Sequence, residues 1–125
     1  MIQAMTDVKE SINSYTMTRE SIVLGAASLA DEEYFQEKKQ MVVATRERTK
    51  EELRRRGFEV LDSSANFLFA KPNSVDAGWL FEELKKEKIF VRHFNGERIK
   101  DYLRISIGTD QQMDCLLQAI DRIMA

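Results

Sequence analysis

The chain has 125 residues and a mass of 14.5 kDa, the size of one ordinary domain whose core can form without a disulfide or metal staple. Its 19 basic and 21 acidic residues give a net charge of −2, which excludes the overall positive field that attracts nucleic acid. One cysteine and one histidine are too few for a disulfide framework or a Cys/His zinc cage, so we expect a reducing, cytoplasmic compartment.

One short helix is predicted within the first 30 residues. Residues 1–18 show no clear periodicity, and residues 13–16 indicate a loop. The helix runs from near Arg19 to Ala30, and its small residues at positions 25–27 predict that another element packs closely against it. Its uncharged run, residues 21–30, is about half of the ~20 residues that cross a bilayer, so we expect no membrane span.

A long second helix is predicted from Asp31, which can cap its first turn, to residues 54–56, with Gly57 as a left-handed stop. Acidic residues in the first turn and basic residues in the last turn match the helix dipole. The large apolar residues lie in the first half, and Leu53 is the only large aliphatic residue in the second half. We therefore expect the second half to protrude, or to face a body that this chain does not contain.

Short extended segments alternate with helices after Gly57. The extended segments are residues 58–61, 66–70, 89–93 and 102–107, the second of them ended by residues 71–73. Ser74 is expected to cap the helix between the second and third segments, and a capping box of Thr109 and Gln112 opens the last helix.

This order of elements predicts an α/β (α+β) fold. We expect a two-layer sandwich in which a small, mostly antiparallel sheet has helices packed on one face, preceded by the long N-terminal helix. The predicted parts are residues 1–57, the N-terminal helical segment with the long linking helix, and residues 58–125, the α/β small domain.

Two arginines are candidates for binding an anion. Strand alternation in residues 102–107 places Leu103 and Ile105 on one face and Arg104 on the face away from the helices. A guanidinium on a rigid strand suits bidentate capture of a carboxylate or a phosphate. Arg92 has a comparable place in the preceding strand, so both could converge on one anion if the two strands pair. The pattern alone leaves the alternative of two solvated surface arginines open.

Two further polar residues lie near these strands. Asn66 starts a strand and could aim its amide at a ligand, although a plain turn role fits equally. His93 falls on the face opposite Arg92, which favours a core or surface histidine over a general base. The chain contains no dinucleotide-binding glycine motif, P-loop, nucleophile elbow or zinc-protease motif. These patterns therefore indicate an α/β domain with an anion site on its sheet.

Four stretches of the chain resemble the carboxyl-terminal part of the histidinol-phosphate aminotransferases, which are fold type I, pyridoxal-phosphate-dependent enzymes. The stretches are VKESINSYT, DEEYF, ATRERTKEELRRRGFEVLDSSANFLFAK and the run from IFVRHF through DYLRISIGT. The resemblance implies the small domain of such an enzyme. It also implies that Arg104 binds the anionic tail of the substrate, that Arg92 helps to hold a phosphate, and that Asn66 begins a strand near the active site.

The chain departs from this family because no lysine matches the one that forms the Schiff base. In the family that lysine follows a serine in a glycine-rich neighbourhood, upstream of the matching segment, with an aspartate for the pyridine nitrogen and a cup for the cofactor phosphate. No lysine here stands in that context: Lys9, Lys38, Lys39, Lys50, Lys71, Lys85, Lys86, Lys88 or Lys100. We expect the parent enzyme, and not this chain alone, to bind pyridoxal phosphate, and we expect this chain alone to be inactive.

The resemblance implies a parent enzyme that moves an amino group between histidinol phosphate and 2-oxoglutarate in histidine biosynthesis. Its implied partners are a small-molecule anion, a missing N-terminal cofactor domain and a second copy of the parent, with no nucleic acid and no membrane. Amino-acid phosphate decarboxylases and aromatic aminotransferases share this domain and stay alternatives. A different alternative is a free-standing anion-binding or oligomerisation module. Separation from the rest of the enzyme is expected to expose apolar surface around Ile22, Val23 and Leu24 and so to promote a non-native dimer.

Overall fold

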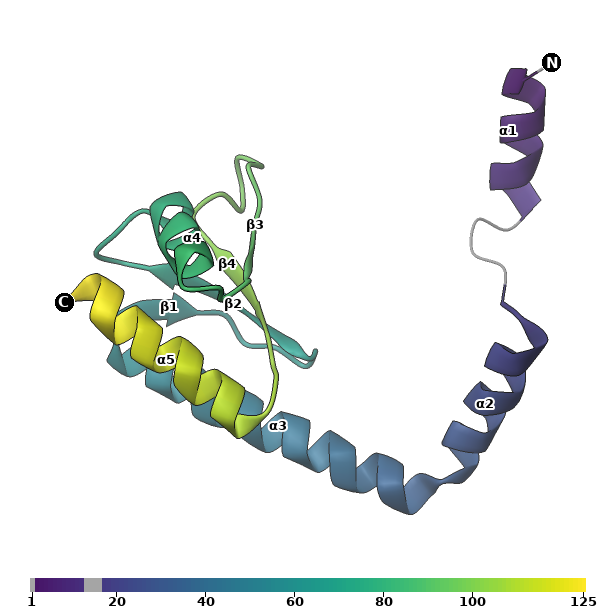
Figure 1. Cartoon of the computed structure of the whole chain (residues 1–125), viewed down its shortest axis with the longest axis horizontal. Helices are drawn as coiled ribbons and strands as arrows, with labels where there is room; N and C mark the ends of the chain where they lie inside the picture. Colours follow the sequence, from purple (N-terminus) through teal and green to yellow (C-terminus); the bar gives the residue numbers. More distant parts are fainter. Residues whose placement is uncertain (1, 13–16) are drawn as a thin grey trace. The chain divides into compact units, whose positions relative to one another are not determined.

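The computed structural model describes residues 2–12 and 17–125, which form two compact units, Met1–Glu37 and Lys38–Ala125 (Figure 1). The loop predicted at residues 13–16 lies outside the described residues. In the described part of the chain, no helix is both long and apolar enough to span a membrane. The predicted functional division after Gly57 stays a prediction.

The first unit contains α1 (Ile2–Ile12) and α2 (Arg19–Ala30). The α2 bounds confirm the predicted helix, and Thr18 caps it by accepting a hydrogen bond from the Ser21 amide at 3.2 Å. No element was predicted in residues 1–12, and this was wrong, because α1 occupies residues 2–12. Apolar residues at every third position, Ile2, Met5 and Val8, form an apolar stripe on this helix. Three residues are too few for this periodicity to be recognised in the sequence.

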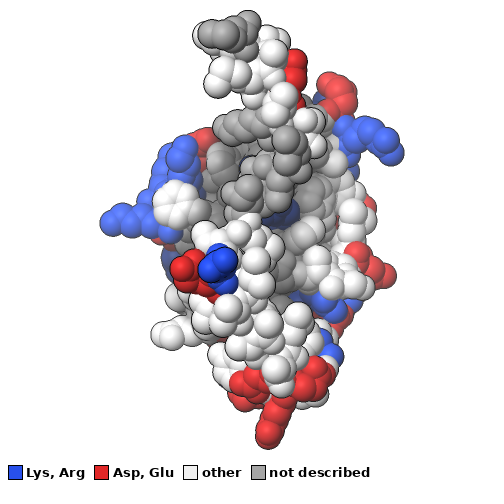
Figure 2. Space-filling view, turned by 90° about the vertical axis from the view of Figure 1, so that its right-hand side faces the viewer, with Lys and Arg blue, Asp and Glu red and all other residues white. Residues whose placement is uncertain are grey.

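Helix α2 buries none of its residues within the described structure. Ile22, Val23 and Leu24 are 56–66% exposed, so the apolar surface expected at these positions is confirmed. The element that was expected to pack closely on the small residues 25–27 is not found among the described residues, and Gly25 faces open space. Figure 2 shows a face on which uncharged surface predominates and acidic side chains gather at the lower end.

Helix α3 (Glu32–Arg55) has the ends that were predicted for it. The Asp31 carboxylate accepts a hydrogen bond from the Tyr34 amide at 3.3 Å and so caps the first turn. Gly57 has a φ of +81°, the left-handed conformation that terminates a helix and that residues with a Cβ rarely adopt.

The expectation for the second half of α3 was wrong, because this half packs within the chain. Thr45, Thr49 and Leu53 recur every fourth residue and are its buried positions, whereas Met41 in the first half is 56% exposed. A stripe of threonines is apolar enough for burial and small enough to admit a close neighbour. Counting only large aliphatic residues missed this face.

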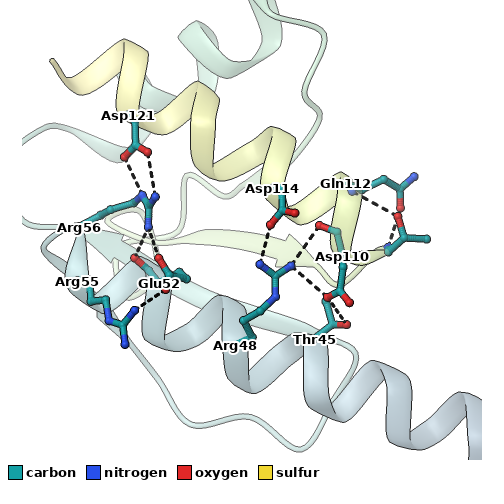
Figure 3. Close-up of polar contacts among 10 residues, drawn as sticks. Thr45, Arg48, Glu52, Arg55, Arg56, Asp110, Gln112, Asp114 and Asp121 are labelled. Carbon is teal, nitrogen blue, oxygen red and sulfur yellow. Dashed lines mark hydrogen bonds and ion pairs between the residues drawn. The ribbon is translucent and has the colours of Figure 1, made fainter.

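Polar contacts along this stripe join α3 to α5 (Asp110–Met124), as Figure 3 shows. The Arg48 guanidinium donates to Asp114 at 2.6 Å and to Asp110 at 3.1 Å, and the Thr45 hydroxyl donates to Asp110 at 2.8 Å. The guanidinium of Arg56, the residue directly after α3, binds both carboxylate oxygens of Asp121, at 2.7 and 2.9 Å. These contacts bridge positions more than 60 residues apart and hold the two helices in register.

The second unit contains the four-stranded antiparallel sheet in the order β1-β2-β4-β3. Its strands are β1 (Phe58–Val60), β2 (Phe67–Pro72), β3 (Arg92–His93) and β4 (Leu103–Ser106). The predicted antiparallel sheet is confirmed, but β1, β3 and β4 are shorter than expected, β3 most of all. Strand β2 continues through Lys71 and Pro72, which were expected to end it, because they pair with Glu59 and Phe58 of β1. Residues 89–91 do not pair, because the chain leaves the preceding helix through Lys88 in a left-handed conformation and the Ile89 amide bonds back to Leu84.

One face of the sheet packs on helices, as predicted. In β2 every second residue is buried, and Leu68 meets Leu103 and Ile105 of β4 in a core completed by α3, α4 (Ala77–Lys86) and α5. The Thr109–Gln112 capping box is present. The predicted cap at Ser74 was wrong, because Asp76 lies directly before α4 and its carboxylate accepts from the Trp79 amide at 2.8 Å.

Candidate anion site on the open sheet face

The two candidate arginines lie directly opposite each other on neighbouring strands. In the β3–β4 pairing Arg92 is the register partner of Arg104, and His93 is the partner of Leu103. The strands therefore pair as convergence of the arginines requires. Directly opposed residues of an antiparallel pair have side chains on the same face with Cβ atoms about 5 Å apart.

Each guanidinium lies over the ring of a phenylalanine. The Arg104 Cζ is 5.1 Å from the ring centroid of Phe67 in β2, and the Arg92 Cζ is 5.3 Å from that of Phe94, which follows β3. Sequence reasoning missed both rings. Strand alternation in residues 66–70 held a signal, because it places large aromatic residues on the face away from the core, where polar residues are usual.

The electrostatics of this pair favour an anion. Two like charges directly across a strand pair repel each other, and no described carboxylate lies within ion-pair distance of Arg92 or Arg104. The Arg104 Nε is buried and has no hydrogen-bond partner in the described structure. A bound phosphate or carboxylate would supply acceptors to that nitrogen and offset the repulsion.

The carboxylate that shares this face is held away from the arginines. The Tyr102 hydroxyl donates to the Glu59 carboxylate of β1 at 2.8 Å. This hydrogen bond raises the pKa of Tyr102, because loss of the phenol proton would break it and leave two negative charges together. Glu59 is thus occupied at the β1 side of the sheet, while the two arginines stand at the β3 side.

Asn66 and His93 contribute differently from the arginines. The Asn66 carbonyl accepts from the Ile107 amide at 2.8 Å, which extends the β2–β4 ladder, and its exposed side chain makes no hydrogen bond with the described residues. Its binding role stays a prediction. The His93 side chain has its Nε2 2.6 Å from the Lys100 carbonyl and its ring 5.9 Å from that of Phe81 in α4. This position confirms that His93 faces away from Arg92, toward the helices.

The residues around two grooves beside α5 do not fit pyridoxal phosphate. A groove of about 560 Å³ between residues 88–91 and α5 has Lys88 in its lining but no carboxylate. A groove of about 510 Å³ beside the start of α5 has Lys38 and Asp110, but the Asp110 carboxylate is already bound by Thr45 and Arg48. Neither groove therefore combines a lysine with a carboxylate available to a pyridinium nitrogen. No described cluster of His, Cys, Asp and Glu could hold a metal ion.

Sequence relatives cover the whole chain but only part of their own length. Histidinol-phosphate aminotransferase from Clostridium acetobutylicum is 42% identical over 125 residues, which are all of this chain and 36% of that protein. The enzyme of the same description from Aromatoleum aromaticum is 44% identical over 124 residues, 99% of this chain and 35% of that protein. The chain thus spans about a third of the length of the curated relatives it matches.

Solved structures agree with these relatives. Histidinol-phosphate aminotransferase from Sinorhizobium meliloti, solved in complex with pyridoxal-5′-phosphate, superposes with a TM-score of 0.77 at 26% identity, covering 95% of this chain and 33% of that one. A decarboxylase from Sulfurospirillum multivorans shares the fold, with a TM-score of 0.76 at 19% identity over 89% of this chain and 33% of that one. The family model described as aminotransferase class I and II matches residues 1–120, and the chain therefore belongs to that family.

Proposed function

We propose that this chain is the substrate-anion-binding domain of a histidinol-phosphate aminotransferase. In the parent enzyme an amino group moves between histidinol phosphate and 2-oxoglutarate, a step of histidine biosynthesis in the cytoplasm. The observation that carries the proposal is the cross-strand pair of Arg92 and Arg104, which lacks any acidic partner in the described structure. Relatives of that description, 42–44% identical over nearly the whole chain, support it.

The two arginines would perform the recognition step. A phosphate ester offers more charge and more acceptor oxygens than a carboxylate, so two adjacent guanidiniums suit it best. Arg104 alone would suffice for the carboxylate of a dicarboxylic partner. Holding the anionic tail at this fixed point would orient the remainder of the substrate. Asn66 directly precedes Phe67, the residue whose ring lies against the Arg104 guanidinium.

We place the Schiff-base lysine and pyridoxal phosphate in a cofactor domain that accompanies this chain in a homodimeric parent enzyme. The two grooves beside α5 support this placement, since neither fits the cofactor. The 125-residue chain by itself is then catalytically inactive. Measurable transamination by this chain with added pyridoxal phosphate would contradict the assignment.

The anion site is tested by titrating the chain with inorganic phosphate and following backbone amide shifts by NMR. We expect residues around Arg92 and Arg104 to shift, with acetate binding more weakly than phosphate. Arg104→Ala should abolish binding, and Arg92→Ala should weaken it about tenfold or more, the loss of one charge-assisted contact. Arg98→Ala is the matched control, because Arg98 lies in the turn after β3 with no ion pair in the described structure. Equal losses in all three variants would overturn the site.

A second candidate function, an oligomerisation module, is favoured by one observation. The apolar surface of α2 around Ile22, Val23 and Leu24 is exposed. The decarboxylase likeness supports the shared fold and does not by itself favour a decarboxylase function.

A further inference from the structure

Few neighbours hold the Arg92 side chain in place, although its guanidinium must be directed at an anion. Its strand, β3, consists of two residues at the edge of the sheet, paired only with β4. An edge strand this short gives its side chains little lateral support, and an exposed arginine has many rotamers of similar energy. The neighbour that the structure gives the Arg92 guanidinium is the ring of Phe94, with 5.3 Å between Cζ and the ring centroid.

Phe94 is itself held by the central strands, although it lies outside any strand. Its ring stacks on that of Phe69 in β2, with centroids 6.3 Å apart and planes 20° apart. The Phe69 ring in turn lies 5.7 Å from that of Tyr102, whose hydroxyl is bonded to Glu59 of β1. We call Phe94, Phe69 and Tyr102 the aromatic row. It connects the edge of the sheet at Arg92 to the opposite edge at Glu59.

We propose that Phe94 is a positioning residue, which holds the Arg92 guanidinium beside Arg104 so that one anion can engage both. The proposal rests on the anion site proposed above. Phe94 touches no substrate in this role. Its ring face attracts the cation, and its stacking on Phe69 fixes where that attraction acts, so fewer Arg92 rotamers must be given up when the anion binds. Phe67 stands in the same relation to Arg104, at 5.1 Å.

The ligand class follows from the pair that is being held. With both guanidiniums in place the site is built for a dianion such as phosphate, whereas a monoanion needs Arg104 alone. Loss of the Phe94 ring should therefore reduce phosphate affinity more than acetate affinity. An exposed cation–π contact corresponds to a change of about two- to fivefold in a binding constant.

The experiment compares three variants of the full 125-residue chain. Phe94→Leu keeps an apolar side chain and removes the aromatic face, and Phe94→Tyr retains the face. Phe90→Leu is the matched control, because Phe90 lies four residues earlier and is 78% exposed. We expect Phe94→Leu to weaken inorganic phosphate binding about threefold with acetate binding nearly unchanged. Phe94→Tyr and Phe90→Leu should bind phosphate as the parent chain does.

A second measurement tests positioning without any ligand. The NMR order parameter of the Arg92 Nε–H bond should be high in the parent chain and in Phe94→Tyr, and lower in Phe94→Leu. An Arg92 that is equally ordered in Phe94→Leu would overturn the positioning role. If phosphate shifts nothing in the parent chain while this order is lost in Phe94→Leu, the anion site fails and the positioning role stands.

A third measurement needs no variant and decides the case if Phe94→Leu does not fold. The Arg92 side-chain methylene protons of the parent chain should show the upfield ring-current shift of protons held over an aromatic face. Random-coil shifts at these protons would overturn the proposal. Melting temperatures of all variants show whether a change in affinity is separate from a change in stability.

Discussion

Arg104 combines three features that an isolated strand would avoid. It stands opposite a second arginine, its Nε is buried without a hydrogen-bond partner in the described structure, and its charge has no carboxylate nearby. Like charges opposite each other cost a few tenths of a kcal/mol to ~1 kcal/mol, and an unsatisfied buried donor costs ~1–3 kcal/mol. Because these features lower the stability of the fold, the presence of an arginine at this position is better explained by ligand binding.

Replacing Arg104 should therefore stabilise the empty protein. Arg104→Met keeps a long, unbranched side chain whose sulfur would contact the Phe67 ring in place of the guanidinium, while it removes the buried Nε and the repulsion. We expect the free energy of unfolding to rise by about 1 kcal/mol in buffer without phosphate. Phosphate at about 100 times its dissociation constant should stabilise the parent chain by ~2.7 kcal/mol and leave the variant unchanged. Urea denaturation with and without phosphate measures both effects, and a less stable variant without phosphate would contradict the argument.

At the scale of elements, the contact between α3 and α5 depends on carboxylates that stay ionised. The Arg56 guanidinium lowers the pKa of Asp121, and the Thr45 hydroxyl together with Arg48 lowers the pKa of Asp110. A carboxyl whose pKa is lower in the folded than in the unfolded state stabilises the fold above its ordinary pKa, 3.8 for Asp. That contribution is lost as the pH falls through the folded-state pKa.

Acid should therefore weaken the contact between α3 and α5. We expect the melting temperature to fall as the pH is lowered below about 4, with part of the fall assigned to Asp121. Asp121→Asn should melt lower than the parent chain at pH 7 and lose less on going to about pH 2. Glu97→Gln, at a side chain that is 91% exposed, should melt like the parent chain at neutral pH. Identical pH profiles for the parent chain and Asp121→Asn would show that this ion pair contributes nothing.

Most elements could be predicted from local signals, whereas the packing of distant segments could not. Helix ends at Asp31, Gly57 and Thr109 depend on contacts with residues up to three positions away, so the local sequence is enough to predict them. The role of the threonine stripe of α3 could not be predicted, because burial there depends on Asp110, which lies 65 residues from Thr45. Arg92 and Arg104 were predictable as candidates, but their register depends on how the turn between β3 and β4 closes.

At the scale of the whole molecule, charge and apolar surface are distributed unevenly. The small net charge of −2 conceals a sheet face with two uncompensated arginines. In the described part of Met1–Glu37, by contrast, α2 has charges only at its first two residues and buries none of its side chains. Contiguous exposed apolar surface on a chain of this size favours self-association.

The isolated chain should accordingly associate through α2. We expect sedimentation velocity to show a weight-average mass that rises with protein concentration. Val23→Lys combined with Leu24→Lys should return the chain to monomer, whereas Phe90→Lys, at an exposed position in the other unit, should not. A monomeric parent chain at high concentration would contradict this prediction and the oligomerisation function with it.

The short β3–β4 connection has a kinetic consequence. Arg92 and Arg104 are adjacent in the sheet and also near each other in the chain, because β3 and β4 form a single antiparallel hairpin. Contacts of low sequence separation need little loop closure and form on the microsecond scale. The β2–β4 pairing differs in this respect, since Phe69 and Arg104 must meet across a whole helix. The anion-binding pair can therefore assemble early in folding, before the core that later supports it has closed.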